Sequence, residues 1–388
     1  MPRIKISLFS QVLQLISSCV IRKTVNRHQS DKHSKGLTTW THLVAMLFCH
    51  LANCNSIREL SNGLRSATGN LNHLGLGRAP SRSSVSYMNK HRNWKVFRDL
   101  YFDLLEQLEP CLVKRRKYAH RLKRKIFILD SSCIPLSLKI FDWAAFRRRK
   151  GAIKLHTVLN YDTALPVFTH ISTGKVHDLT VARNLDFPSG SVFVVDKAYV
   201  DYPWLYQQDQ RGCFFVTRLK QNASFQVTKT MERPAHHEHI LSDQHIRLDG
   251  PLTASKYPKT LRIVRIYDAQ NQREFTFLTN NMFWTADTVA QLYQARWDIE
   301  VFFKTIKQTL KIKTFIGTCP NAVRIQIWTA LIAILLVKYL KAKAAYPWSL
   351  SNLVAFLRIN LFVKIDLWQW LNQPFQKTKD PPMTLALF

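Results

Sequence analysis

The chain lacks the cysteine pattern of a zinc-binding or disulfide-linked module. It has 388 residues and seven cysteines, which form no CxxC pair and follow no regular spacing. An odd and irregular set argues against a zinc finger and against a disulfide framework. We expect reduced, mostly buried thiols, as in a cytosolic protein.

A hydrophobic run long enough to cross a membrane is also missing. The longest apolar stretch, residues 327–337, is well short of the ~20 residues that a spanning helix needs, so a buried helix is the better interpretation. The apolar N-terminal segment contains Gln11 and Gln14 and has no small-x-small cleavage site, which argues against a signal peptide. We therefore predict no membrane segment.

Acidic residues are few. Aspartate and glutamate total 25 against 56 lysines and arginines, which gives a formal net charge of +31. An excess on this scale favours a polyanionic partner, with nucleic acid first and an anionic membrane surface second. A soluble protein that is merely basic is the alternative. The basic residues are spread over the whole chain rather than along one amphipathic helix, which weighs against the membrane.

The first part of the chain, residues 1–110, is predicted to be an all-α domain that binds DNA. Its apolar residues recur at steps of three and four, and Ser56 and Glu59 have the spacing of a capping box. A turn or linker is expected at residues 78–84, with a helix following through residues 101–108. A helical bundle without DNA contacts fits the same pattern.

An α/β catalytic core is predicted to begin at residue 111 and to run to residue 222. Short apolar, β-branched runs predict strands, and a run that Gly212 ends predicts a helix. The strands are expected at residues 125–130, 152–161, 166–173, 191–196 and 213–219, and the helix at residues 202–212.

The second half of the chain is predicted to interrupt this core and then complete it. Strand-like pieces dominate residues 223–284, which we interpret as a β-rich insertion. Residues 285–345 return to the core with a long helix to about residue 313 and a further helix at residues 321–345. Residues 346–388 form a C-terminal tail.

Two aspartates follow buried strand-like runs and are candidate metal ligands. Asp130 and Asp196 each end such a run, and ligands bind at the carboxyl ends of strands in open α/β sheets. A buried carboxylate is costly without a positive partner. Each aspartate alone could be a helix cap or a turn residue. Together they resemble oxygen ligands for a hard divalent cation.

The predicted helix near residue 300 adds a polar stripe. At about 100° per residue, its members share one face about 80° wide, beside an apolar face. An ordinary solvated face with Glu–Lys pairs would look similar. The stripe consists of Tyr293, Arg296, Glu300, Lys304 and Lys307.

These residues match a family pattern. The string YQARWDIEVFFKTIK (293–307) resembles the Y-x2-R-x3-E-x6-K signature of DDE transposases encoded by bacterial insertion sequences. The segments FILDSS (127–132) and VVDKAYVDY (194–202) resemble those around the first and second aspartates of that family, and HDLTVA (177–182) also resembles a family segment. The likeness covers roughly residues 5–345.

The resemblance implies a ribonuclease-H-like mixed sheet flanked by helices, with the β-rich insertion before the glutamate helix. It implies that Asp130, Asp196 and Glu300 hold two Mg²⁺ ions, for which Mn²⁺ can substitute. The ions would lie about 3.5–4 Å apart, with Asp130 bridging them. The expected reaction is nicking at transposon ends, a hairpin intermediate and strand transfer, in cut-and-paste transposition.

The expected DNA contacts follow from the same resemblance. Tyr293, Arg296 and Lys307 would approach phosphates near the cleaved bond, with Arg218 and Lys220 as weaker candidates. Lys304 is a further candidate DNA contact. An aromatic residue of the insertion stacks on a flipped base in related enzymes, and Phe275 or Trp284 is a candidate for that role, although aromatic residues are more often core. The basic runs at residues 114–117 and 147–150 are expected to contact DNA nonspecifically.

Three other features invite chemistry but have simpler explanations. The histidines of segment 236–245 show no zinc-ligand spacing and are expected in a polar loop. Cys133 has no evident activating base. Asp201 matches an accessory turn residue of the family.

The expected partners are DNA, as terminal inverted repeats and as target, and a second copy of the chain in the synaptic complex. A bacterial, cytoplasmic and nucleoid-associated protein is implied. Two alternatives share these residues: a metal-dependent endonuclease without strand transfer, and a transposase-derived DNA-binding protein that no longer cleaves. The presence of all three carboxylates weighs against the second.

Overall fold

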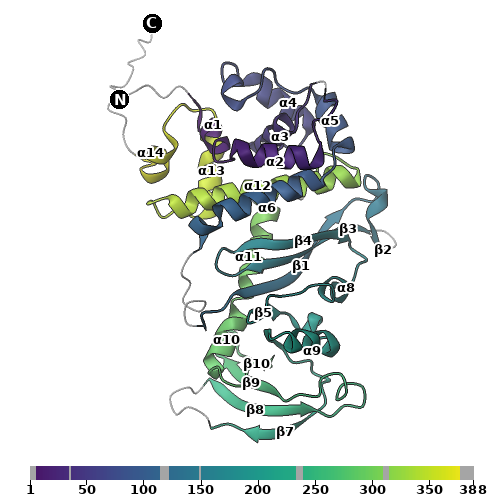
Figure 1. The fold of residues 1–388 in the computed structure, drawn as a ribbon. Helices are drawn as coiled ribbons and strands as arrows, with labels where there is room; N and C mark the ends of the chain where they lie inside the picture. Colours follow the sequence, from purple (N-terminus) through teal and green to yellow (C-terminus); the bar gives the residue numbers. More distant parts are fainter. Residues whose placement is uncertain are drawn as a thin grey trace. The chain divides into compact units, whose positions relative to one another are not determined.

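A computed structural model describes residues 6–34, 36–113, 122–147, 150–232, 239–308 and 314–375. The chain divides into two units (Figure 1). Unit 1 comprises residues 1–111, 309–317 and 321–388, and unit 2 comprises residues 112–308 and 318–320. The C-terminal helices thus group with the N-terminal ones, whereas the predicted domain boundaries separate them.

Unit 1 is built from helices in its described residues. They are α1 (Leu8–Leu13), α2 (Ser18–His28), α3 (Thr39–Ala52), α4 (Ile57–Ser66), the 3₁₀ turn η1 (Asn72–Leu74), α5 (Arg82–His91), α6 (Lys95–Leu112), α12 (Pro320–Lys343), α13 (Leu350–Asn360) and α14 (Leu367–Asn372). The predicted tail therefore carries two helices before residue 376.

Serine caps set several of these helix starts. Ser56 accepts a hydrogen bond from the Glu59 amide at 3.1 Å, and the Glu59 carboxylate accepts one from the Asn55 amide at 2.8 Å, so the predicted capping box is confirmed. Ser81 caps α5 through the Ser84 amide. The expected linker at 78–84 is therefore shorter, because a helix begins inside it.

Helix α12 contains the apolar run noted in the sequence. Among the described residues it is the one helix long and apolar enough to cross a membrane, by length and composition alone. Because 83% of its most apolar window is buried within the protein, it has the character of a core helix. Its buried residues include Trp328, Leu335 and Leu336.

Unit 2 carries a ten-stranded sheet. Its strands are β1 (Ile126–Leu136), β2 (Ala145–Arg147), β3 (Lys150–Asn160), β4 (Leu165–Thr173), β5 (Val192–Val195), β6 (Phe214–Arg218), β7 (Phe225–Thr230), β8 (Ile240–Leu248), β9 (Leu261–Asp268) and β10 (Arg273–Thr279). Its helices are α8 (Asp178–Ala182), α9 (Tyr202–Gln210), α10 (Ala286–Gln294) and α11 (Trp297–Gln308), with 3₁₀ turns η2 (Asp142–Ala144) and η3 (Lys197–Tyr199).

The sheet is mixed, and the mixture has an order. Its strands run β2-β3-β1-β5-β6-β10-β9-β8-β7, with β4 also paired to β3. The pairs β1–β5 and β5–β6 are parallel, and the others are antiparallel. The four strands of the predicted insertion continue the same sheet, because β10 pairs with β6. A mixed α/β architecture is thereby established.

Three expectations from the sequence, two about secondary structure and one about the cysteines, were wrong. The segment taken for a polar loop contains β8, whose residues Ile240, Ile246 and Leu248 are buried. The long helix expected from residue 285 is two helices, since α10 ends at Gln294 and α11 begins at Trp297. The cysteines are free but not mostly buried: Cys19, Cys111 and Cys133 are exposed.

Aromatic packing forms the core beside the parallel strands. Phe193 of β5 lies between Phe187, at 4.8 Å between ring centroids, and Trp204 of α9, at 5.2 Å. Phe215 of β6 joins the same cluster. Fully burying side chains of this size stabilises the fold by roughly 1.5–3 kcal/mol each. This aromatic core thus stabilises the parallel strands β5 and β6.

Candidate active site

The parallel pairing of β1 with β5 brings two aspartates to one edge. The last paired residues are Leu129 and Val195, and the next residues along the two strands are Asp130 and Asp196. Strand β5 ends there as predicted. Strand β1 does not, since it continues to Leu136 along the antiparallel β3. The edge that carries both carboxylates is therefore the end of the parallel pairing rather than the end of β1.

Asp196 is not a helix cap. It precedes the turn η3, but within the described residues its side chain makes no capping hydrogen bond to that turn. Its Oδ1 instead accepts a hydrogen bond from the hydroxyl of Tyr293 at 3.2 Å. Burial raises the pKa of Tyr293 to about 12, so this hydroxyl keeps its proton and donates.

One guanidinium binds two of the predicted carboxylates. Arg296 Nη1 donates to Asp130 Oδ2 at 3.1 Å, and Arg296 Nη2 donates to Glu300 Oε1 at 2.6 Å. Arg296 lies at the joint between α10 and α11, where its amide bonds to the Tyr293 carbonyl in a 3₁₀-type turn. Tyr293, Arg296 and Glu300 therefore meet at the aspartates, although they do not share one continuous helix.

The electrostatics of Asp130 show that negative charge is in surplus. Burial, together with the charges of Asp196 and Glu300, raises the pKa of Asp130 to about 6 against the lowering effect of the Ser131 amide and Arg296. For Arg296, burial lowers the pKa, but Tyr293, Glu300 and Asp130 outweigh it and raise the net value. One half-buried cation thus binds two carboxylates, and the charge of a third, Asp196, acts on Asp130.

The three carboxylates do not form a ready metal cage. Within the part of the chain that the structure describes, no three histidine, cysteine or acidic side chains converge closely enough to hold a metal ion. Arg296 lies between Asp130 and Glu300, where it supplies the positive charge. The donors are oxygen only, and their charge exceeds what one arginine balances, which fits a hard divalent cation such as Mg²⁺.

Comparison with known proteins decides the family. A family model described as the transposase DDE domain matches residues 95–336, and a second model, for a domain of unknown function, matches residues 5–77. The first match covers more than half of the chain and contains all three carboxylates. The chain belongs to the DDE transposases. Its function is DNA transposition, carried out by a transposase with nuclease and strand-transfer activity.

Curated relatives support the same membership. A protein of Sinorhizobium fredii that carries the name transposase y4zB is 31% identical over 263 residues, which is 67% of this chain and 71% of the relative. A protein of Geobacillus stearothermophilus named for insertion sequence element IS5377 is 27% identical over 68% of this chain and 71% of its own length. One of Synechocystis, named for element IS4SA, is 25% identical over 75% and 81%.

A solved transposase structure is a distant neighbour. The cryo-EM structure of the piggyBac transposase synaptic complex with hairpin DNA covers 92% of this chain and 80% of that chain, at a TM-score of 0.44 and 11% identity. Likeness at that level supports no argument about the DDE site.

The basic side chains predicted to bind DNA differ in their contacts within the protein. Lys307 donates to Ser132 Oγ at 2.6 Å and to the Cys133 carbonyl at 2.8 Å, so it ties α11 to β1. Arg218 lies 5.0 Å from the Phe275 ring and within electrostatic reach of Tyr293. The Lys220 ammonium donates a hydrogen bond to the Val200 carbonyl, whereas the Lys304 side chain is exposed to solvent.

The two aromatic candidates of the transposase are engaged in packing. Phe275 lies under Arg218, and the ring of Trp284 lies 5.5 Å from that of Phe214. Phe283, between β10 and α10, was not among the predicted aromatic candidates, although its side chain is 94% exposed. Its amide donates to Asn281 Oδ1, so the backbone beneath the exposed ring is fixed. A phenylalanine next to Trp284 was visible in the sequence, but its exposure was not.

A polar cluster next to Asp130 was also missed. Asp178, at the start of α8, lies 3.3 Å from His156 Nδ1 and 3.4 Å from Lys154 Nζ. Burial would raise the pKa of Asp178, but hydrogen bonding by His156 and Ser131 and the charges of Lys154 and His156 hold it well below its usual range. Asp178 lies within the HDLTVA segment, and the β1–β3 register sets its two partners, Ser131 and His156, opposite each other.

The remaining sequence candidates have structural explanations or are not described. Asp201 caps α9 through the Trp204 amide and pairs with Arg183 at 2.6 Å. His239 pairs with Asp287 at 2.7 Å. Outside the described residues lie His236 and His237, residues 114–117, and the side chains of 147–150.

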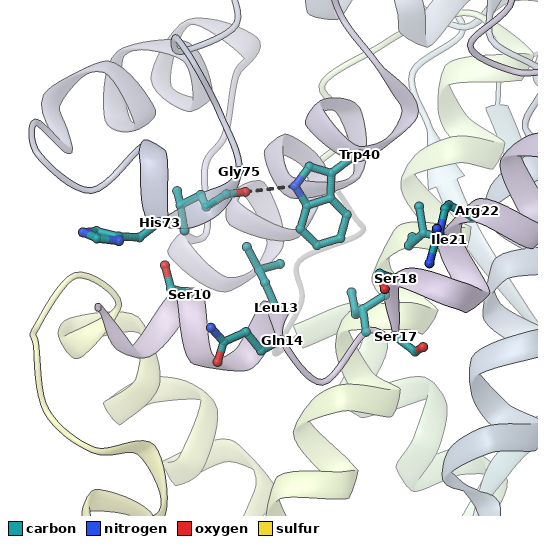
Figure 2. A pocket seen from close by; sticks show the side chains of 12 residues that line it. Ser10, Leu13, Gln14, Ser17, Ser18, Ile21, Arg22, Trp40, His73 and Gly75 are labelled. Atoms are coloured by element: carbon teal, nitrogen blue, oxygen red, sulfur yellow. Dashed lines mark hydrogen bonds between the residues drawn. The ribbon is translucent and has the colours of Figure 1, made fainter. Parts of the chain in front are cut away.

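A cavity of about 670 Å³ opens in unit 1 but contains none of the predicted site residues (Figure 2). It lies among residues of α1, α2 and α3, where Trp40 Nε1 donates to the Leu74 carbonyl at 2.9 Å. Ser10, Gln14 and Arg22 contribute polar groups to its lining. The cavity is therefore not part of the candidate active site.

Proposed function

We propose that Asp130, Asp196 and Glu300 are the catalytic carboxylates and that they hold Mg²⁺, as two ions, with Mn²⁺ as a substitute. The reaction is cleavage of DNA at transposon ends followed by strand transfer, in cut-and-paste transposition. One observation carries the assignment: at the end of the parallel strand pairing, Asp130 and Glu300 share a single half-buried arginine, and Asp196 lies within electrostatic reach of Asp130. A structural ion pair would balance its charges.

The proposed core is ribonuclease-H-like. Three antiparallel strands, β4, β3 and β1, continue into two parallel strands, β5 and β6, which supports this assignment. The antiparallel strands β7 to β10 then act as the insertion that precedes the glutamate helix α11. This explains why Glu300 reaches the aspartates although 104 positions separate it from Asp196.

The proposed roles of the chain's own residues follow from their contacts. When bound, Mg²⁺ supplies the charge that stabilises the attacking and leaving oxygens of phosphoryl transfer. Arg296 neutralises Asp130 and Glu300 in the resting protein, and its N–H groups are suited to a phosphate when DNA competes for them. Tyr293 holds Asp196 in one orientation.

Lys307 has two proposed functions that succeed one another. In the resting protein it fixes α11 against β1 through Ser132 and Cys133, which keeps Glu300 near Asp130. The phosphate contact expected from the family signature would require its ammonium to exchange those partners for DNA. Lys304, Arg218 and Lys220 remain proposed DNA contacts, supported by charge and by their elements.

DNA is the proposed partner, as terminal inverted repeats and as target. The net charge of +31 supports it. A homodimer in the synaptic complex is proposed because two ends must be joined in one assembly. A cytoplasmic, nucleoid-associated location in a bacterium is part of the same proposal.

The test is cleavage of DNA that carries the element's own ends. Wild-type protein, Glu300→Gln and an exposed-residue control, Glu274→Gln, are incubated with Mg²⁺ or with EDTA. We expect cutting at the boundary and joined products for wild type and the control only, and none in EDTA. Cutting without joined products would indicate an endonuclease. Binding without cutting by every protein would indicate a transposase-derived DNA-binding protein that no longer cleaves. Either result would overturn the proposal.

A further inference from the structure

Helix α5 in unit 1 has an outward face of unusual composition. At about 100° per residue, its exposed positions fall within an arc of roughly 200°. They are Arg82, Ser83, Ser84, Ser86, Tyr87, Lys90 and His91. Tyr87 is 60% exposed and its ring lies 4.3 Å from that of His91, so the helix end also carries an aromatic pair. The face offers hydrogen-bond donors, positive charge and a flat apolar surface.

The same region contains no counter-charge along the chain. Residues 60–98 include seven lysines and arginines and not one aspartate or glutamate. Two of the seven are paired with acids outside this range, Arg92 with Asp31 and Arg98 with Asp99, whereas Arg82 and Lys90 of α5 are exposed. The first turn of α5 also has no acidic residue, so the positive end of the helix is not neutralised locally. A solvated face of a soluble protein normally mixes both signs. This face is complementary to a polyanion.

The opposite face of α5 is mounted rigidly within unit 1. Val85 and Asn89 are buried, and Asn89 Oδ1 lies 2.8 Å from His42 Nε2 on α3. Asn321 donates to the carbonyls of Asn89 and Arg92 at 2.9 and 2.7 Å. A helix that displays basic and aromatic side chains while its inner face is fixed by buried polar bonds presents those side chains in a defined geometry.

The helix that precedes it completes the arrangement. Helix α4 packs against both α3 and α5. In helix-turn-helix proteins the second of two packed helices enters the major groove, and residues near its N-terminus contact base edges. Here the connection, residues 67–81, is longer than the usual turn, but the second helix again carries the exposed Arg, Ser and Lys side chains.

We propose that α5 is the helix through which the transposase reads the DNA sequence at its element's ends, by insertion into the major groove of the duplex. Arg82 and Lys90 contact base edges or flanking phosphates, and Ser83 and Ser86 donate hydrogen bonds between them. The proposal rests on the proposed function for its partner but not for its site, because none of the three carboxylates takes part.

The experiment measures duplex binding in EDTA, where cleavage plays no part. The probes are a labelled duplex with the element's terminal sequence and a scrambled duplex of equal composition. The Arg82→Ala/Lys90→Ala double variant is compared with wild type and with a matched control, Arg22→Ala/Lys364→Ala, whose residues are also exposed in unit 1. Ser86→Glu adds a carboxylate to the face without removing any donor other than one hydroxyl.

We expect the α5 double variant to lose about 30-fold or more in affinity for the terminal duplex, because each contact contributes roughly 1–3 kcal/mol. Ser86→Glu should lose affinity as well, while the control changes little. Thermal melting should be unaltered, since the changed side chains are exposed.

The proposal is overturned if wild type does not prefer the terminal duplex, if the α5 variants keep that preference, or if both duplexes lose equally. It is also overturned if the control loses as much. Glu300→Gln serves to separate the two proposals: binding like wild type without cleavage supports the carboxylate assignment whatever the α5 result. Loss of binding confined to α5 variants supports the helix whatever the fate of the carboxylates.

Discussion

Two arginines of unit 2, one buried and one half-buried, meet carboxylates in different ways. Arg262 of β9 binds a single aspartate, with Nε donating to Asp243 Oδ1 at 2.7 Å and Nη2 donating to Oδ2 at 2.5 Å. Arg296 divides the same fork between Asp130 and Glu300, and the third carboxylate, Asp196, lies within electrostatic reach of Asp130. One site balances its charges and the other does not.

The difference separates a structural pair from a candidate catalytic centre. A one-to-one bidentate pair needs nothing further, and removing either partner leaves a buried charge. A site with surplus negative charge gains from an additional cation. The antiparallel half of the sheet holds the balanced pair, whereas the parallel pairing gathers the surplus.

The largest expected effect is on catalysis at the unbalanced site. Asp130→Asn should lower cleavage of end DNA by ~10³-fold or more, because ligand loss removes several kcal/mol of transition-state stabilisation. Its free energy of unfolding should not fall, since a surplus negative charge is removed. Cleavage rates and urea denaturation on the same samples check both. If Asp130→Asn cleaved within tenfold of wild type, the carboxylates at Arg296 would not differ in function from the structural pair at Arg262.

The balanced pair should show the reverse behaviour. Asp243→Asn leaves the buried Arg262 without its counter-ion and should lower the free energy of unfolding by roughly 3–5 kcal/mol. Denaturant titration measures this. The double replacement Asp243→Leu/Arg262→Met is the control, because removing both charges should restore most of the stability. A single variant as stable as wild type would show that the pair is not structural.

A smaller effect is expected where the unbalanced site is supported. Asp178→Asn should reduce both cleavage and Mn²⁺ affinity by about 10- to 100-fold, the usual range for partners behind metal ligands. The physical reason is that Asp178 holds Ser131, next to Asp130, through the network with His156. Asp186→Asn, at an exposed position of unit 2, is the control. A fall in stability without any change in metal affinity would assign Asp178 to folding alone.

The exposed ring of Phe283 in unit 2 tests whether an aromatic side chain contacts DNA. Phe283→Ala should leave stability within roughly 0.5 kcal/mol, because the ring is 94% exposed. If the ring stacks on an unpaired base, which contributes about 1–3 kcal/mol, hairpin formation should slow by roughly fivefold to 150-fold. The fluorescence of 2-aminopurine at the element end reports the unstacked base. Tyr267→Ala, at an exposed position on β9, should change neither signal.

The smallest effect concerns the buried pair of His42 and Asn89 in unit 1. Here we expect only the free energy of unfolding to depend on pH. Burial, with the charge of Arg92, lowers the pKa of His42 to about 3, against the raising effect of Asn89. Because the unfolded state binds the proton first, stability should fall as pH decreases from about 6.5 toward 3, by at most about 1.4 kcal/mol per pH unit. The His42→Gln variant should lack this component in urea titrations at pH 7 and pH 4.5. Equal slopes for both proteins would contradict the buried neutral state.

Much of the fold could be predicted from local patterns. Apolar runs located β1, β5 and β6, and the spacing of Ser56 and Glu59 located a helix start, because burial and capping act over a few residues. The order of carboxylates and basic residues was enough to identify the family. These features depend on neighbours in the sequence, and the sequence therefore reports them directly.

The remainder depends on contacts that local sequence does not encode. Strand β8 was missed because polar residues separate Ile240 from Ile246, and only its pairing with β9 makes it a strand. The joint at Arg296 occurs without glycine or proline in residues 285–308. The partnership of Asp178 with His156 needs the register of β1 with β3 and the position of α8. Tertiary packing decides each of these.

The most direct test of the unbalanced site is Mn²⁺ binding without DNA, followed by electron paramagnetic resonance of the free ion. We predict that wild type binds Mn²⁺ and that Asp130→Asn binds it at least about tenfold more weakly, as expected when a ligand is lost. Asp243→Asn, studied under conditions where it remains folded, should bind as wild type does. Equal Mn²⁺ binding by wild type and Asp130→Asn would contradict the assignment of the surplus carboxylates to a metal site.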